Sequence, residues 1–519
     1  MWFLDGDVAP LLGSVAKALS FMAAHDVVKG CSMSRRLGTL CAWGVLVATT
    51  PSGLQAAELT DVVDAADVQN NNPYDFHIEP TIGQKFEQGV ITREGPCGQT
   101  TTPECELPQT ALTRELDYRR VTTQMDFDFQ IGLFRDLEFH TTLPIVVSDQ
   151  RELRYADGVN QSNSSISPSD TRIAAGLNTA FSNDDEFFTE YRLFDVQNDG
   201  PKRSGLGDMA FGLAWSPYND QRNPHAATLT MAFDYVAPTG RPQRGSNNGV
   251  GRGVHEIQFA IAASRRFEEA HLDPYFGFRF ALPMAASNGL FEQNTNSPLT
   301  APGARFMFTA GTEVSMYANA ERAQDFTFDV GMDFGYQLEG RDYSPLFDAL
   351  ANTSCNGLTP QDAGLTSIPD GNVYRPESLP SAANGACSWI VQQPGNADLS
   401  PGQALGVNTP FSHDGILDVE GFGSVGGHTG FNLQFNSYVK LRLGFGFLYQ
   451  TPHFLTTADA GSDADNNDIV DLNPQGTGGD GGVIERNPNY NLVLDAVGRR
   501  MRLENALSLN WNVGLAIQF

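Results

Sequence analysis

The segment DFTFDVGMDFGYQLEG, residues 325–340, alternates strictly between large apolar and small or polar side chains. Every second residue from Phe326 to Leu338 is apolar, and threonine, aspartate, glycine, glutamine and glutamate fill the other positions. Side chains of a β-strand point alternately to its two faces, whereas a helical face repeats every 3.6 residues. The segment therefore predicts a β-strand with one apolar and one polar face.

The same alternation recurs along the whole chain, for example in VTTQMDFDFQIGL at 121–133 and LEFHTTLPIVV at 137–147. Such period-two patterns over so many segments predict an all-β protein. The predicted strands are 74–92, 115–133, 137–149, 204–217, 227–239, 253–267, 273–284, 304–317, 325–340, 415–435, 438–452 and 500–519.

The predicted connections alternate in length. Those after even-numbered strands are short, such as 134–136, whereas those after odd-numbered strands include 150–203, 341–414 and 453–499. An even number of antiparallel strands with this loop pattern is typical of outer-membrane barrels, and closure leaves no strand edge in the bilayer. We therefore expect a single antiparallel transmembrane β-barrel of about twelve strands, with short periplasmic turns and long extracellular loops. Its apolar faces would contact outer-membrane lipid.

Composition argues against other classes. Charged residues make up only 18% of the chain, and the formal net charge is −28 at pH 7. This acidic excess argues against nucleic-acid binding, which needs a basic surface. The sequence has no apolar run of about 18 residues, so we expect no membrane-spanning helix. No cofactor motif stands in a suitable context, and we expect no cofactor.

Residues 33–56 have the order and length of a secretory signal peptide, with a basic start, an apolar run and small residues at the end. A buried core helix is the alternative. Because such signals lie at the amino terminus, we interpret 1–32 as a mis-called N-terminal extension. Residues 57–73 would then be a periplasmic segment, and 74–519 the barrel in the bacterial outer membrane.

Four cysteines of the predicted mature chain form two close pairs, Cys97 with Cys105 and Cys355 with Cys387. Each pair lies in a predicted loop. An even number of cysteines at short spacing in an exported chain favours two disulfides. A metal site is the rival interpretation, but no histidine lies at ligand spacing.

The final stretch, 505–519, alternates in the same way and finishes on an aromatic residue. This pattern resembles the signal by which the barrel-assembly machinery recognises its clients, so that machinery is an expected partner. The residues that carry the pattern are Trp511, Val513, Leu515, Ile517 and Phe519.

Projecting the alternation inward assigns charged side chains to the barrel interior. The basic residues on the last two strands would form a basic wall there. Two interpretations stay open: a transverse field that orients a permeating solute, or a salt-bridge network that fills a narrow interior. The predicted interior residues are Asp126, Asp128, Glu138, Asp234, Arg279, Asp329, Asp333, Lys440, Arg442, Arg500 and Arg502.

A calcium loop is a weak candidate at Asp463, Asp465 and Asn467, which have the spacing of its first three ligands. The loop's usual glycine is replaced by Asp468 and its final glutamate by Pro474. A solvated acidic loop is therefore the preferred interpretation.

Three stretches, IGLFRDLEFHTTLPIV (131–146), SGLGDMAFGLAW (204–215) and MAFDYVAPTGRP (231–242), resemble motifs of one barrel family. Together they resemble the outer-membrane family named for the meta-pathway of phenol degradation. The resemblance covers about 120–290. It implies a transporter of small, often aromatic molecules, and it supplies no binding residues.

The sequence thus predicts an outer-membrane channel for passive, selective uptake of a small-molecule solute of hydrophobic or aromatic character. Twelve strands lie between filled and open barrels, which favours a narrow or partly plugged conduit. One alternative is a non-conducting barrel whose long loops bind a partner. The other is a membrane-embedded lipid hydrolase. We expect no enzyme, because neither G-x-S-x-G nor H-E-x-x-H occurs in the sequence.

Overall fold

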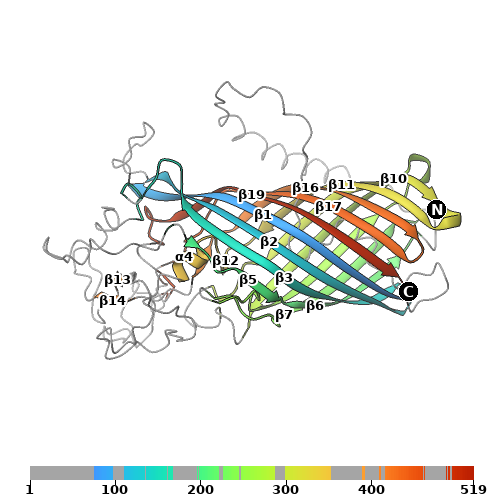
Figure 1. The fold of residues 1–519 in the computed structure, drawn as a ribbon, viewed down its shortest axis with the longest axis horizontal. Coiled ribbons are helices and arrows are strands. Elements are labelled where there is room, and N and C mark those ends of the chain that lie inside the picture. The colour runs from blue at the N-terminus through green and yellow to red at the C-terminus, as the bar shows by residue number, and fades with distance from the viewer. Residues whose placement is uncertain are drawn as a thin grey trace, which may run out of the picture. The chain divides into compact units, whose positions relative to one another are not determined.

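A computed structural model of the chain shows the fold (Figure 1). The residues that it describes are 75–96, 110–134, 136–160, 162–166, 196, 198–220, 226–244, 247–286, 291, 299–351, 389–391, 408–410, 415–459, 461, 487, 489–490 and 494–518. Within these residues, no helix is both long and apolar enough to cross a bilayer.

Twelve antiparallel strands pair in sequence order, and the last pairs with the first, which closes a barrel. The closing contact extends from the pair His77–Gln518 to the pair Arg93–Met501. The strands are β1 (Phe76–Pro96), β2 (Thr110–Phe134), β3 (Leu137–Tyr155), β6 (Met209–Tyr218), β7 (Thr228–Ala237), β8 (Val254–Ser264), β9 (Leu272–Ala285), β10 (Arg305–Asn319), β11 (Gln324–Gln337), β16 (Phe422–Asn436), β17 (Val439–Gln450) and β19 (Met501–Gln518).

Each predicted strand overlaps one strand of the barrel, so the predicted fold is confirmed. The connections after β2, β6, β8, β10 and β16 are short and lie together at one end, which we call the short-turn end. β1, β3, β7, β9, β11 and β17 end at the opposite end of the barrel, which we call the long-loop end (Figure 1). Two of the short turns contain the 3₁₀ helices η3 (Glu268–Ala270) and η5 (Ala320–Arg322).

Short elements extend the long-loop end. β4 (Asn198–Asp199) and β5 (Arg203–Leu206) pair with β3, and β18 (His453–Phe454) pairs with β19. Further elements belong to the connection between β11 and β16. They are β12 (Gly340–Tyr343), the helix α4 (Phe347–Ala351), β13 (Trp389–Val391), β14 (Asn408–Pro410) and β15 (Ile416–Val419).

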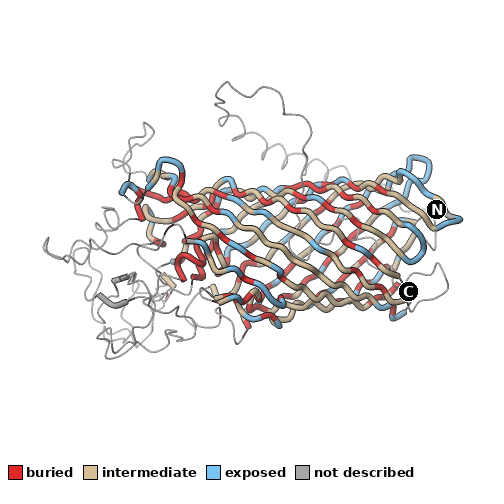
Figure 2. Tube along the Cα trace, in the orientation of Figure 1, coloured by how far each residue is buried: buried red, intermediate tan, exposed pale blue. Residues whose placement is uncertain are grey.

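The alternation of the sequence becomes an alternation of burial along each strand (Figure 2). In β9, Phe276 and Phe278 are exposed on the outer face, whereas Tyr275 and Ala281 are buried on the inner face. A soluble sheet would show the opposite arrangement, with its apolar face covered. The barrel therefore carries its apolar face outward.

A one-residue bulge in β19 reverses this pattern near the long-loop end. The pairing of β1 with β19 shifts between Gln88 and Val90, and Asn505 takes a left-handed conformation with φ 51°. An added residue in a strand moves every following side chain to the other face. Leu503 therefore turns inward and is buried, and Arg502 lies on the opposite, outer face. The sequence had placed Arg502 inside.

The prediction of a basic wall is also wrong, because the strand register places its arginines at different levels of the barrel. Arg442 on β17 pairs with Gly514 on β19, and Arg502 pairs with Thr92 on β1. Twelve residue steps of about 3.3 Å separate Gly514 from Arg502, which places the two arginines about 40 Å apart along the strand direction. They cannot share one field.

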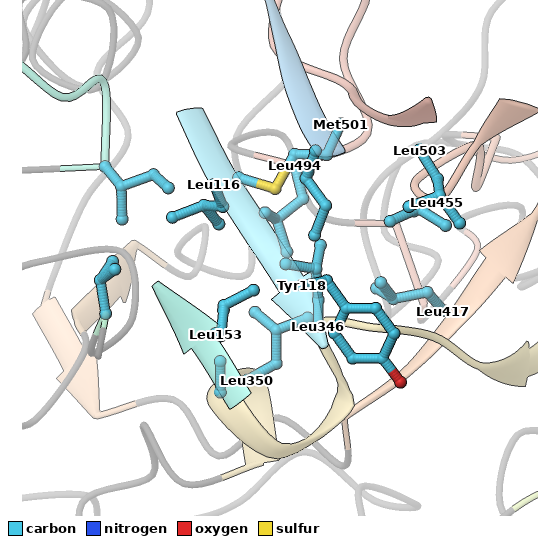
Figure 3. Packing of buried hydrophobic residues seen from close by; sticks show 14 of the residues in the cluster. Leu116, Tyr118, Leu153, Leu346, Leu350, Leu417, Leu455, Leu494, Met501 and Leu503 are labelled. Atoms are coloured by element: carbon cyan, nitrogen blue, oxygen red, sulfur yellow. The ribbon is translucent and has the colours of Figure 1, made fainter. Parts of the chain in front are cut away.

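The long-loop end contains an apolar core of inward-facing strand residues and loop residues (Figure 3). β12, α4 and β15, together with residues 344–346 and 415, form a unit that we call the plug. Leu346, Leu350 and Leu417 of the plug pack with Leu116 of β2 and Leu153 of β3 in this core. All five side chains are buried. Part of the long connection from β11 to β16 therefore folds into the mouth of the barrel.

Candidate functional site

Exposed apolar side chains form a continuous band around the barrel. On β1 the band extends from Phe76 to Phe86. Ten residue steps of about 3.3 Å give about 33 Å of strand, and a strand tilt of about 40° reduces this to a height of about 25 Å. This height matches the apolar band of membrane barrels. Other exposed members are Ile82, Phe233, Phe259, Phe276, Phe308, Met332 and Phe445.

Exposed tyrosine and tryptophan side chains border the band at both ends. Tyr235, Tyr336 and Tyr449 lie near the ends of β7, β11 and β17 at the long-loop end. The border at the short-turn end consists of Trp215, Tyr218, Tyr317 and Tyr438. Aromatic rings with a polar atom concentrate at both interfaces of a bilayer. Two such borders indicate a barrel that spans a membrane.

We expect a charge in the middle of this band to destabilise the barrel. Replacing Met332, which is exposed near the middle of β11, with arginine should lower the free energy of unfolding by about 2–4 kcal/mol. The matched variant Leu338→Arg, beyond the Tyr336 border, should cost about 1 kcal/mol or less. Urea unfolding in lipid vesicles measures both values. Equal losses would contradict the assignment of the band.

Polar side chains on the inner face bridge strands that are not adjacent. His140 on β3 reaches Asp234 on β7, with 2.6 Å between Nε2 and Oδ1, across β6. The residue beneath this bridge is Gly212, where a β-carbon would stand 2.0 Å from Asp234 Oδ1. Arg442 on β17 reaches Glu79 on β1 at 2.8 Å, across β19. Such contacts are possible only on the concave, inner face of the barrel.

Replacing Gly212 with alanine should break the His140–Asp234 bridge, because a methyl group there overlaps both side chains. Loss of this partly buried hydrogen bond to a carboxylate should lower the free energy of unfolding by about 1–3 kcal/mol. Gly423 on the outer face of β16 provides the control. A β-carbon there has its nearest neighbour at 3.5 Å, and Gly423→Ala should change stability by about 0.5 kcal/mol or less. Similar midpoints for both variants in urea would contradict the bridge.

A hydrogen-bonded cluster occupies the interior beside β9, β11 and β16. The phenol of Tyr275 donates to Asp329 at 2.6 Å and lies 2.7 Å from His428 Nε2. The other ring nitrogen of His428 lies 2.8 Å from Asp333, which also accepts a bond of 2.7 Å from Thr309. These side chains are buried. The cluster ties four strands together on one side of the interior.

Burial shows how narrow the interior is. The inward-facing alanines of β6, β7 and β8 form one buried cluster. Asp329 of β11 and His428 of β16 also face inward and are buried. Asp126 and Asp128 of β2 are only half-buried. The carboxylate of Asp126 accepts a hydrogen bond from Gln124 at 2.7 Å, and Asp128 accepts one from Thr142. Solvent therefore reaches the interior along β2 more than along β8 or β11.

The remaining predicted interior residues are dispersed. The interior-facing Glu138 lies 3.7 Å from His140, and Arg279 donates to Gln258 at 3.4 Å. Lys440 of β17 lies opposite Gln434 of β16 in the strand register, near the short-turn end. Arg500 donates two bonds of 2.9 Å to Glu94 at the long-loop end and lies over the ring of Phe454.

A buried ion pair holds the plug to the wall. Nη1 of Arg203, on β5, donates to Oδ2 of Asp348, on α4, at 3.0 Å, and Nη2 donates to Oδ1. Nη2 also donates to the carbonyl oxygen of Arg244 at 3.0 Å. Arg203 is fully buried, with 0% of its surface exposed. Nη1 of Arg151, on β3, lies 3.9 Å from Asp348 Oδ2 and adds positive charge. We call this contact the first latch.

A second latch joins β12 to β8 and β10. Arg252 donates to Asp342 at 2.7 Å and to Glu256 at 3.3 Å, and Glu256 also pairs with Arg305. The neighbouring Tyr343 hydroxyl donates to the carbonyl oxygens of Gln243 and Arg252, at 3.1 and 3.3 Å. Burial raises the pKa of the Tyr343 phenol, which therefore stays neutral and keeps its proton for these bonds.

The first latch continues into the wall as alternating charges. From the latch, Arg151 lies 3.3 Å from Asp149, and Asp149 lies 2.7 Å from Arg120. Arg120 then contacts Glu87 at 3.2 Å, and Glu87 contacts Lys85 at 2.7 Å. Each charge has neighbours of opposite sign, which offsets its loss of hydration.

The sequence missed the latch residues Arg151, Arg203 and Asp348. Two of the quoted motifs nevertheless meet next to β5, where Asp208 of one motif contacts Gly240 of the other. The carboxylate of Asp208 accepts hydrogen bonds from the backbone N–H groups of Gly240 and Arg252, at 2.9 and 2.7 Å. These motif residues fix the backbone around β5 and β8, and no residue type in them marks an ion pair with a distant loop.

The outer face bears on the hydrolase alternative. His255 of β8 faces outward, and its Nδ1 lies 2.6 Å from the hydroxyl of Tyr235, with the two rings stacked. A serine hydrolase needs a serine hydroxyl within hydrogen-bond distance of one of the two ring nitrogens of such a histidine. Tyrosine occupies the observed contact.

Several predicted features lie outside the described residues. They are the signal peptide and both flanking segments up to residue 73, Cys97, Cys105, Cys355, Cys387, Asp463, Asp465, Asn467 and Phe519. The other residues of the predicted assembly signal, Trp511 to Ile517, lie on β19 with the predicted outward alternation.

No protein-family model and no curated protein matches the chain. Among solved structures, it is similar to an outer membrane channel from Pseudomonas putida F1, with TM-score 0.34, 9% identity, and coverage of 85% of this chain and 95% of that one. It is also similar to the translocator domain of the autotransporter NalP from Neisseria meningitidis (TM-score 0.31, 8%, 89% and 95%). A third is the Pseudomonas putida toluene transporter TodX (0.29, 8%, 90% and 94%). Likeness at this level assigns no function.

Proposed function

We propose that the chain is an outer-membrane channel for passive, selective passage of small solutes of hydrophobic or aromatic character. The observation that carries the proposal is the polarity of the barrel. An apolar band about 25 Å high with aromatic borders surrounds an inner face of charged and amide side chains. A barrel that spans the membrane and keeps polar groups inside supplies a path that lipid does not.

The interior supports selectivity by size. Most inward-facing side chains are buried, and the half-buried surface follows β2 at Asp126 and Asp128. Twelve strands enclose less space than the sixteen to eighteen of wide porins. A solute would pass singly, in contact with the wall.

The mouth supports the apolar character of the solute. Leucines of the plug and of β2 and β3 meet in the apolar core of the long-loop end, next to the rings of Tyr343 and Phe347. If the plug moves, these side chains form an apolar entrance above a polar barrel. The motif resemblance to a family of aromatic-solute transporters points the same way.

Single-channel conductance of the refolded chain in a planar bilayer tests the proposal, with heat-shifted gel mobility as the check of folding. We expect small discrete steps whose size changes when Asp126, half-buried on the inner face, is replaced by lysine. The control is Arg119→Glu, which changes an exposed charge on the outer face of β2. Silence from a folded barrel would contradict free passage and favour the alternative in which the loops bind a partner.

A further inference from the structure

We propose that Arg203 and Arg151 form a binding site for the carboxylate of a small organic acid, and that Asp348 of the plug is its internal occupant. An acid that displaces Asp348 would release the first latch and open the mouth. The binding part rests on the geometry of the site, and the opening part rests on the proposed channel function.

The donor set is built for a carboxylate. Two N–H groups of Arg203 reach the two oxygens of Asp348, which is the bidentate geometry that arginine offers to planar anions. A bond of 3.0 Å to the carbonyl oxygen of Arg244 fixes the orientation of the guanidinium. Arg151 adds a second positive charge 3.9 Å from the same carboxylate. Since Arg203 is fully buried, an anion must always occupy this place.

The wall also leaves space for the occupant. Gly200, between β4 and β5, lies against the carboxylate, and a β-carbon there would stand 2.8 Å from Asp348 Oδ2. The close approach of Asp348 therefore depends on glycine at this position. Gly200, Arg151 and Arg203 all belong to the wall and not to the plug, so the seat remains when the plug leaves.

Phe347, which precedes Asp348 in the plug, indicates which group the ligand would carry next to its carboxylate. Phe347 is fully buried, and its ring lies 5.8 Å from the guanidinium carbon of Arg203. Val254 of β8 and Phe291 belong to the same apolar cluster. The plug thus presents a carboxylate next to an aromatic ring. A small acid with an aromatic or compact apolar body would match both halves of this seat.

Exchange of one carboxylate for another explains how the latch can open. Withdrawal of Asp348 alone would leave Arg203 buried without an anion, which is strongly unfavourable. An incoming carboxylate keeps the arginine paired throughout. Deeper in the barrel, Asp126 and Asp128 oppose the passage of an anion, so we assign the acid an effector role at the mouth, separate from the transported solute.

Binding of benzoate to the refolded full-length chain by calorimetry tests the site. Asp348 competes from within the molecule at an effective concentration of about 1 mM or more. Benzoate should therefore bind wild type weakly and bind Asp348→Asn at least about tenfold more tightly, since the competitor is neutral. Benzyl alcohol, which has the ring without the charge, should bind neither. Arg203→Gln should abolish benzoate binding, and Arg203→Lys should weaken it by losing the bidentate contact.

Control variants separate this site from general electrostatics. Asp342→Asn removes a similar charge from the second latch. It should raise benzoate affinity much less than Asp348→Asn does, because Asp348 stays in place as the internal competitor for Arg203. Equal affinity of wild type and Asp348→Asn for benzoate would overturn the proposal, as would binding that survives in a folded Arg203→Gln barrel.

Conductance then distinguishes the two proposals. Benzoate should raise the open probability of wild type and have no effect on Arg203→Gln. Benzoate binding with the expected variant pattern, but with no conductance in any variant, would retain the site and reject the channel. Conductance that ignores bound benzoate would retain the channel and reject the opening role of the acid.

Discussion

The variant Asp348→Ala should conduct more than wild type, with longer or more frequent openings. Removing the carboxylate leaves Arg203 fully buried without its anion, and Arg151 loses a neighbour of opposite charge. Removing one partner of a buried ion pair destabilises the state that contains it by about 3–5 kcal/mol. That energy works against the docked position of α4, because the plug is the part that can move away. Single-channel recording and protease cleavage of residues 340–351 would measure the release.

The second latch supplies the comparison. Arg252 is partly exposed and keeps Glu256 when Asp342 is lost, so Asp342→Asn should release the plug far less, at a cost of about 1 kcal/mol. The apolar core that packs Leu346 and Leu350 is unchanged in both variants. Equal conductance and equal protease protection of Asp348→Ala and wild type would show that the ion pair does not hold the plug.

The barrel strands could be predicted from the sequence because the alternation that marks each strand lies within that strand. Alternation in 325–340 decides that the segment is a strand and which side chains share a face. The same rule placed Asp126, Asp234 and Asp329 on the inner face, where the structure has them bridged to other polar groups. No knowledge of the partner strand is needed for this step.

Relations between strands could not be predicted in this way. A bulge at Asn505 changes the facing of Arg502, and nothing in the local alternation marks it before the pairing with β1 is known. The separation of Arg442 from Arg502 likewise follows from antiparallel register. Residues on neighbouring strands are close only if their register agrees.

The sequence favours a partly plugged barrel, but the contacts that hold the plug were beyond prediction for a different reason. Asp348 lies within a long loop without periodicity, and its partner Arg203 is 145 residues away. Glycines within the strands carry a partial signal of the interior contacts. Gly212 and Gly514 stand inside strands, where glycine often marks a close approach of other groups, and both lie beneath a cross-strand bridge.

The variant Arg442→Ala should destabilise the barrel as strongly as any change in the interior. Arg442 donates to Glu79 at 2.8 Å above Gly514, and both side chains are buried. Without the arginine, the buried Glu79 carboxyl group loses its charged partner, and the free energy of unfolding should fall by about 3–5 kcal/mol. Urea unfolding in lipid vesicles would show the loss. For contrast, Arg114→Ala removes an exposed ion pair with Asp117 and should cost about 1 kcal/mol or less.

A second substitution decides whether the pair is structural or serves as a field for solutes. In the double variant Glu79→Gln with Arg442→Ala, no charge is left without a partner, so most of the lost stability should return. If the pair only fills the interior, the double variant should also keep the conductance of wild type. If the pair supplies a transverse field, stability should return while ion selectivity changes. An equal loss in the single and double variants would mean that Arg442 stabilises the barrel through packing and not through Glu79.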